Sequence, residues 1–236
     1  MKRLAAAALV LLAMGASAGE FSVSPVRIFM HANERAIAVT VVNEGTEELV
    51  MQSEIYSWRQ KPGGEDALTP TEDLVLSPPI VKLAPKARQV LRLARVGAPA
   101  AGQEQSYRMI VREVPEARQT DRNAKVQMAL AFSLPIFITP PGAKRQVQCD
   151  VQRTSAEAVK VNCGNNGKAY AQIRGITLFA PNGATLATRD FVGYLLPDVQ
   201  RTIELQAPNA IPPGRVKVQV GYDDGSTQSF DGTLAE

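Results

Sequence analysis

Histidine and cysteine are scarce in this chain of 236 residues, and their scarcity excludes whole classes of function. The one histidine, His31, would have to serve any histidine-dependent catalytic triad or dyad, and no nucleophile motif surrounds it. Two cysteines and one histidine are also too few for a structural zinc site, which takes four such ligands. The sequence therefore predicts no enzyme, no bound metal and no cofactor.

A strong net charge is also missing. The formal charge of +3 includes Lys2 and Arg3, and without these two residues it falls to +1. Partners such as nucleic acids or acidic membranes usually require a concentrated basic surface. The composition therefore argues against both partners.

Long apolar runs are absent except for one short run at the N-terminus. Met1–Arg3 is basic, Leu4–Met14 is apolar, and Ala16–Ala18 forms a small-x-small cleavage site. About 11 apolar residues are too few to span a bilayer, which takes roughly 20. Residues 1–18 are therefore predicted to be a cleaved secretory signal peptide, the alternative being an N-terminal membrane anchor.

The two cysteines, Cys149 and Cys163, both lie in the second half of the chain. In an exported protein such a pair is expected to form a disulfide. The alternative is a metal site, which would need more ligands than two thiols and the distant His31.

Apolar residues recur with period two in short segments bounded by glycine, proline and asparagine, which is typical of an all-β protein. Lys61–Thr71 and Pro78–Pro85 are predicted to be connections because they carry turn residues. Seven strands in some 120 residues fit an immunoglobulin-like sandwich. The predicted strands are Phe21–Met30, Ile37–Asn43, Leu49–Trp58, Leu74–Leu76, Val90–Leu93, Ser106–Val114 and Val126–Ile138.

Prolines at Thr139–Gly142 interrupt the pattern and predict a short, stiff elbow between two domains, residues 19–139 and 142–236. The second domain is also predicted to be an immunoglobulin-like β-sandwich. Its predicted strands are Gln146–Gln152, Ala158–Cys163, Ala171–Ala180, Gln200–Leu205, Arg215–Tyr222 and Gln228–Leu234, with turns at Asn165–Gly167, Pro181–Gly183 and Asp223–Gly225.

The segment Val126–Ile138 is large and apolar at every even position and carries no charge. Pro135 within it favours an edge strand, because proline cannot donate a hydrogen bond to a ladder. Edge strands usually protect themselves with charge or by being short. The segment is therefore interpreted as a strand whose apolar residues serve another chain, and the alternative is an ordinary core strand.

Several segments, in order and spacing, resemble the periplasmic chaperones of the chaperone–usher pathway, which assemble pili. Val126–Leu130 and Ser133–Phe137 resemble the last strand of that family's first domain. The other matching segments are Ser24–Arg27, Val41–Asn43, Ser77–Pro79, Tyr107–Arg108 and Arg112–Pro115.

The resemblance implies a periplasmic chaperone that binds pilus subunits by donor-strand complementation and delivers them to an outer-membrane usher. In this mechanism the chaperone lends an edge strand to a subunit sandwich that lacks its last strand. The residues implied as donors are Val126, Met128, Leu130 and Phe132. Arg27 matches the arginine that holds the subunit's terminal carboxylate between the two domains.

The chain departs from the family pattern at Pro135, where the best-known branch carries a lysine as the second carboxylate anchor. Arg108, on the neighbouring strand, is our candidate for the missing cation, and the alternative is that Arg27 anchors alone. Ser133–Pro135 is more similar to the divergent, archaic branch, and the loop Glu116–Lys125 is short.

Two further alternatives stay open from the residues alone. The chain could instead be a secreted adhesive or structural pilus component with two immunoglobulin-like domains, although both of its domains look complete. Self-association of the free form would also cover an apolar edge. Asp223–Gly225 is interpreted as a hairpin turn, because the ligand spacing of a calcium loop is missing.

Overall fold

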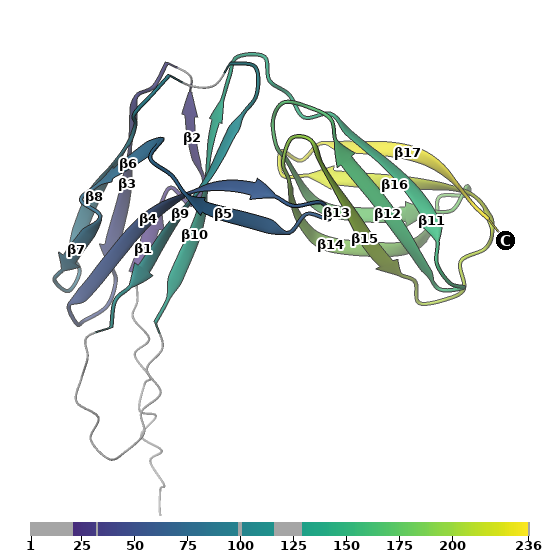
Figure 1. Cartoon of the computed structure of the whole chain (residues 1–236). Helices are drawn as coiled ribbons and strands as arrows, with labels where there is room; N and C mark the ends of the chain where they lie inside the picture. Colours follow the sequence, from purple (N-terminus) through teal and green to yellow (C-terminus); the bar gives the residue numbers. More distant parts are fainter. Residues whose placement is uncertain (1–20, 32, 99–100, 116–128, 236) are drawn as a thin grey trace, which may run out of the picture.

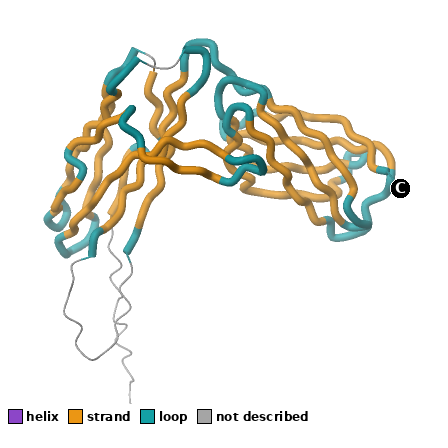
Figure 2. The backbone as a smooth tube through the Cα atoms, viewed as in Figure 1, coloured by secondary structure: helices purple, strands orange, loops and turns teal. Residues whose placement is uncertain are grey.

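The structure, a computed structural model, describes residues 21–31, 33–98, 101–115 and 129–235 (Figure 1). Throughout these residues the regular elements are strands and no helix occurs (Figure 2). A helix long and apolar enough to cross a membrane is accordingly not found in this part of the chain. The predicted all-β class is confirmed.

The first sandwich pairs a four-stranded sheet with a larger one. The smaller sheet has the order β1-β3-β8-β6, and the larger has the order β2-β10-β9-β4-β5 with β7 paired to β4. Its strands are β1 (Phe21–Ser24), β2 (Ile28–His31), β3 (Ala36–Asn43), β4 (Leu49–Gln60), β5 (Asp66–Pro70), β6 (Leu74–Ser77), β7 (Ile80–Leu83), β8 (Arg88–Arg95), β9 (Gln105–Glu113) and β10 (Ala131–Thr139).

The second sandwich lies at an angle to the first (Figure 1). Its two sheets have the orders β11-β12-β15 and β14-β13-β16-β17. Its strands are β11 (Val147–Arg153), β12 (Ala158–Asn165), β13 (Ala171–Phe179), β14 (Thr185–Leu195), β15 (Val199–Gln206), β16 (Gly214–Tyr222) and β17 (Thr227–Leu234). The chain therefore forms two immunoglobulin-like β-sandwiches, as the sequence predicts.

The two hydrophobic cores meet at the junction between the sandwiches. Residues of the first sandwich form one core cluster. Trp58 and Phe137, from β4 and β10, instead belong to the core cluster of the second sandwich. Burial of these two large side chains removes apolar surface from water and so favours a fixed angle between the domains.

The disulfide is confirmed. Cys149 and Cys163 occupy directly opposed positions of the antiparallel pair β11–β12, with Cα atoms 4.1 Å apart. The bond closes a loop with a sequence separation of 14 and should stabilise this domain by about 3 kcal/mol through the entropy of the unfolded chain.

The prediction of one strand over Phe21–Met30 is wrong. β1 pairs with β3 in the smaller sheet, whereas β2 pairs with β10 in the larger sheet. The chain crosses between the sheets around Pro25, which has no N–H to donate to a ladder. The crossing places Arg27 immediately before β2.

Three strands were not predicted. β5 lies in the stretch Lys61–Thr71 expected to be a loop, and β7 lies in the connection Pro78–Pro85. β14 has a register shift against β13 and several consecutive exposed residues. β5 is also largely exposed. As exposed edge strands, β5 and β14 lack the alternation of buried and polar residues on which the sequence argument depends, whereas the four residues of β7 do alternate.

The last strand of the first domain starts later than predicted. β10 begins at Ala131, and Ala129 and Leu130 are described but not assigned to a strand. Backbone pairing still reaches one residue further, because the N–H of Glu113 donates to the carbonyl of Leu130 at 3.0 Å. Val126 and Met128 lie outside the described residues.

Candidate functional site at the interdomain corner

Two arginines of the first domain lie at the junction with the second domain, which we call the interdomain corner. Besides Arg27 and Arg108, the corner comprises Trp58, Phe137, Tyr170, Tyr194 and Asp223. The arginines are the two cations that the sequence predicts as carboxylate anchors. Their surroundings show what each one contacts in the free protein.

Arg27 forms an ion pair with Asp223, in the turn that joins β16 to β17. The Arg27 side chain is 31% exposed and the Asp223 side chain 13%. Burial tends to lower the pKa of Arg27, but hydrogen bonds to Tyr170 and Asp223 raise it on balance. Arg27 is therefore a permanent positive charge with one side open to solvent and a carboxylate already bound.

Arg108 is more deeply placed. Its guanidinium lies over the ring of Trp58, 3.7 Å from the ring centroid, and 5.4 Å from the centroid of Tyr194. A long ion pair of 3.5 Å joins it to Asp66. Burial lowers the pKa of Arg108, and the nearby Asp66 opposes this effect. Such stacking on aromatic rings orients a guanidinium while leaving its N–H groups free to donate.

Pro135 lies directly opposite Arg108 in the pairing of β10 with β9. The departure from the family's lysine is therefore matched by a cation one strand away, at the same level of the sheet.

Aromatic side chains connect the two arginines. Tyr170 stacks on Phe137 with ring centroids 3.9 Å apart, and Tyr194 meets Trp58 edge-on at 5.2 Å. Burial raises the pKa of Tyr194, and the charges of Arg27 and Arg108 both act against this rise. Tyr194 is therefore within electrostatic reach of both arginines.

Two polar side chains of the first domain, Glu104 and Gln60, form hydrogen bonds to the backbone of the second domain. The buried Glu104 accepts hydrogen bonds from the Thr139 hydroxyl at 2.6 Å and from the backbone N–H of Tyr170 at 2.9 Å. The Gln60 side chain accepts from the N–H of Leu196 at 3.0 Å and donates to the carbonyl of Tyr194 at 3.1 Å. In Figure 1 the β4–β5 hairpin reaches from the first domain to the second.

One edge of β10 is open next to this corner. β9 pairs with Ala131–Ile138 of β10, but β2 pairs only with Ile136–Thr139. The preceding residues, Ala131–Pro135, have no strand partner on that side among the described residues. Ala131, Phe132 and Ser133 are exposed. The edge strand predicted from the sequence is therefore present, but only the first part of β10, Ala131–Pro135, lies at the edge of the sheet.

The even positions of β10 divide in the same way. Leu134, Ile136 and Ile138 are buried in the first core, whereas Phe132 is 40% exposed. Leu130 is half-buried against the core. The core interpretation is therefore correct for the second half of the strand, and the partner interpretation remains a prediction for the first half.

Sequence reasoning did not identify Tyr170, Tyr194, Glu104 or Asp223 as site residues. Asp223 was interpreted as a turn residue, and the turn is confirmed by a hydrogen bond of 3.2 Å from the N–H of Gly225 to the carbonyl of Tyr222. The sequence around Asp223 does not indicate its contact with Arg27, because Arg27 lies 196 positions away in the chain.

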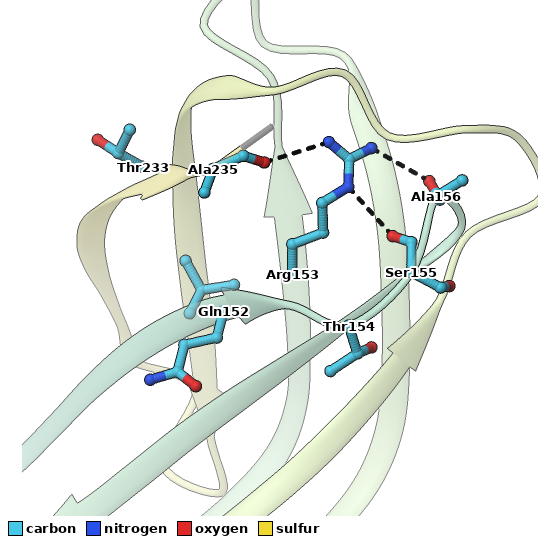
Figure 3. Close-up of a pocket in the computed structure, with 8 residues that line it drawn as sticks. Gln152, Arg153, Thr154, Ser155, Ala156, Thr233 and Ala235 are labelled. Atoms are coloured by element: carbon cyan, nitrogen blue, oxygen red, sulfur yellow. Dashed lines mark hydrogen bonds between the residues drawn. The ribbon is translucent and has the colours of Figure 1, made fainter.

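A surface pocket at the far end of the second domain contains Arg153, whose guanidinium is already hydrogen-bonded within the chain (Figure 3). Arg153 donates hydrogen bonds to the carbonyls of Ser155 at 3.1 Å, Ala235 at 3.4 Å and Ile211. These contacts hold a loop and the end of the chain together. The arrangement is therefore structural.

Comparison with known proteins agrees with this architecture. A sequence model of the family described as pili and flagellar-assembly chaperone, PapD N-terminal domain, matches residues 20–144. The chaperone protein LpfB of Salmonella typhimurium is 29% identical over 139 residues, which are 58% of this chain and 56% of LpfB. The chain therefore matches little more than half the length of this curated relative.

Solved structures show the same fold across both domains. The CsuC–CsuE chaperone–tip adhesion subunit pre-assembly complex from archaic chaperone–usher pili of Acinetobacter baumannii has 23% identity, with a TM-score of 0.66 over 92% of this chain and 100% of that one. The SafA pilin–SafB chaperone complex of Salmonella enterica has 16% identity, with a TM-score of 0.63 over 93% of this chain and 99% of that one. At these identities the likeness shows the fold.

Because the family model covers more than half of the sequence, this chain belongs to the pili and flagellar-assembly chaperones.

Proposed function

We propose that this protein is a periplasmic chaperone that holds pilus subunits by donor-strand complementation and passes them to an outer-membrane usher. Residues 1–18 would be removed on export, leaving the domains 19–139 and 142–236. The archaic branch of the family is the one that Pro135 and the similarity to the CsuC–CsuE complex favour.

The open edge of β10 beside a pair of arginines is the observation that carries this proposal. An incomplete subunit sandwich needs a strand to complete its sheet and apolar side chains to fill its groove. Ala131–Pro135 present unpaired backbone on one side, and the uncharged segment before them carries the predicted donors Val126, Met128 and Leu130. Phe132 extends this apolar series into the described strand.

The arginines supply the second half of the recognition. A subunit strand that pairs with the β10 edge and ends near the corner would bring its terminal carboxylate to Arg27, with Arg108 as the second cation. Guanidinium groups suit this role because they stay charged and bind both oxygens of a carboxylate. The aromatic side chains around them exclude water and strengthen the charge interaction.

Co-expression with candidate subunits encoded near the gene tests the proposal. The intact protein should make one of them soluble and resistant to protease, and Arg27→Ala should abolish this effect while leaving the melting temperature near that of the wild type. Arg92→Ala, which removes an exposed arginine of β8 in the other sheet, is the matched control and should leave the subunit yield unchanged.

Normal subunit yield from Arg27→Ala would remove Arg27 from the site. Purification without any subunit, but with a glycan or a second copy of the chain, would favour the adhesive alternative.

A further inference from the structure

The candidate anchor Arg27 already holds a carboxylate of its own chain. The ion pair with Asp223 crosses from the first domain to the second and is largely shielded from solvent on the Asp223 side. Any external carboxylate that reaches Arg27 must therefore share the guanidinium with Asp223 or displace it.

The turn that carries Asp223 is held in place by its neighbours. The backbone N–H of Asp223 donates to the carbonyl of Gln172 at 3.2 Å. Next to it, Asp224 accepts hydrogen bonds from the N–H and the hydroxyl of Ser226 and forms an ion pair of 2.9 Å with Arg145. The Asp223 carboxylate is thus presented to Arg27 from a fixed position.

Each arginine of the corner has a carboxylate partner before any ligand arrives. Arg27 is paired with Asp223, and Arg108 is paired with Asp66. These two carboxylates repel an incoming carboxylate from positions close to the arginines that attract it. A terminal carboxylate alone gains little from such a site.

We propose that Asp223 is a built-in competitor for the subunit's terminal carboxylate, and that it makes anchoring depend on strand pairing. A ligand that offers only a carboxylate cannot displace Asp223 effectively. A ligand that also pairs with the edge of β10 is held close to Arg27, and its carboxylate then competes at a high effective concentration. Asp223 is therefore a specificity-determining residue of the interdomain corner. This inference rests on the proposed role of Arg27 as the anchor.

The test compares peptide binding by the wild type and four variants. The probe is a synthetic peptide of alternating valine and threonine, made with a free C-terminal carboxylate and as the C-terminal amide. Affinities are measured by calorimetry and by the fluorescence of Trp58, the one tryptophan of the chain, which contacts Arg108. The ratio of acid to amide affinity isolates the contribution of the carboxylate.

Asp223→Asn should raise the affinity for the free acid about 3–10-fold, the effect of removing one partly exposed competing charge, and leave the amide unchanged. Asp224→Asn is the matched control. It removes the same charge one residue away, from a carboxylate that pairs with Arg145 instead of Arg27, and should change neither affinity by more than about twofold. Asp223→Ser repeats the neutralisation in case the asparagine variant folds poorly.

Arg27→Ala separates this inference from the proposed function. If Arg27→Ala abolishes the preference for the acid while neutral Asp223 variants bind the acid no better than the wild type, the competitor role is overturned and the anchor stands. Weaker acid binding by these variants also overturns it, and would make Asp223 a positioning residue that orients Arg27. If the neutral Asp223 variants show no preference for the acid, and Arg27→Ala has the same ratio of acid to amide affinity as the wild type, then both the anchor role of Arg27 and the competitor role of Asp223 are wrong.

Discussion

The two halves of β10 carry the same alternating pattern and have opposite surroundings. In Ile136–Ile138 the strand is paired on both sides, by β9 and by β2, and its side chains are buried. In Ala131–Pro135 one side is open, and Ala131–Ser133 are exposed, whereas Leu134 and Pro135 are buried. A single strand thus joins a half that is paired on both sides to a half whose outer edge has no strand partner among the described residues.

The difference shows how a chaperone can expose an apolar strand without losing its own fold. Leu134 and the second half fix the position and register of the strand, so the exposed residues Ala131–Ser133 need not contribute much to stability. Pro135 lies at the boundary, immediately before pairing with β2 begins. The following predictions test this division, from the largest expected effect on stability to the smallest.

Ile136→Ala should lower the free energy of unfolding by about 2–5 kcal/mol, because it leaves a cavity at a fully buried position. Urea denaturation followed by circular dichroism measures the change. A loss below about 1 kcal/mol would mean that the second half of β10 is not the structural half.

Phe132→Ala should cost about 1 kcal/mol, since the ring is partly exposed and its edge-to-face contact with Phe21, at 4.9 Å, is lost. Subunit capture in the co-expression assay should fall more clearly than stability. If unfolding free energy drops as far as in Ile136→Ala, Phe132 belongs to the core and the boundary lies earlier in the strand.

The next prediction concerns Glu104, whose carboxylate accepts hydrogen bonds from Thr139, at the end of β10, and from the backbone N–H of Tyr170 in the second domain. The variant is Glu104→Gln. Burial raises the pKa of Glu104 above its ordinary 4.5, so the folded state binds a proton more readily than the unfolded chain. The free energy of unfolding of the wild type should therefore fall as the pH rises from 4.5 through the raised pKa of folded Glu104. In Glu104→Gln, which cannot titrate at this position, the free energy of unfolding should depend less on pH over the same range.

Denaturation midpoints between pH 4 and pH 8 measure the slope for both proteins. Glu65→Gln, at a side chain that is 72% exposed, serves as the control and should keep the wild-type slope. If stability depends on pH equally in Glu104→Gln and in the wild type, protonation of Glu104 is not coupled to folding.

Replacing Met128 and Leu130 together with serine should change the free energy of unfolding least, by about 0.5 kcal/mol, while abolishing most subunit capture. Leu130 is half-buried at the start of the open half, and Met128 precedes it in the chain. Melting temperature and subunit yield of this double variant, measured side by side, distinguish a donor role of the two residues from a core role. A collapsed melting temperature would make these residues core rather than donor.

Much of the fold could be predicted because its signals are local. Period-two alternation located most strands, and the disulfide followed from two cysteines on neighbouring strands. β5 and β14 escaped prediction because exposed edge strands need not alternate. The break between β1 and β2 escaped as well, since the strand pattern continues through Pro25 although the chain changes sheets.

The sequence by itself determined the all-β class, the two sandwiches and the apolar, uncharged character of the segment that ends in β10. Tertiary structure alone decided which half of β10 lies at an edge, because that depends on where β2 starts to pair. It also brought Asp223 to Arg27 across 196 positions. Alternation is a property of consecutive residues, whereas edges and ion pairs between domains depend on which distant segments the folded chain brings together.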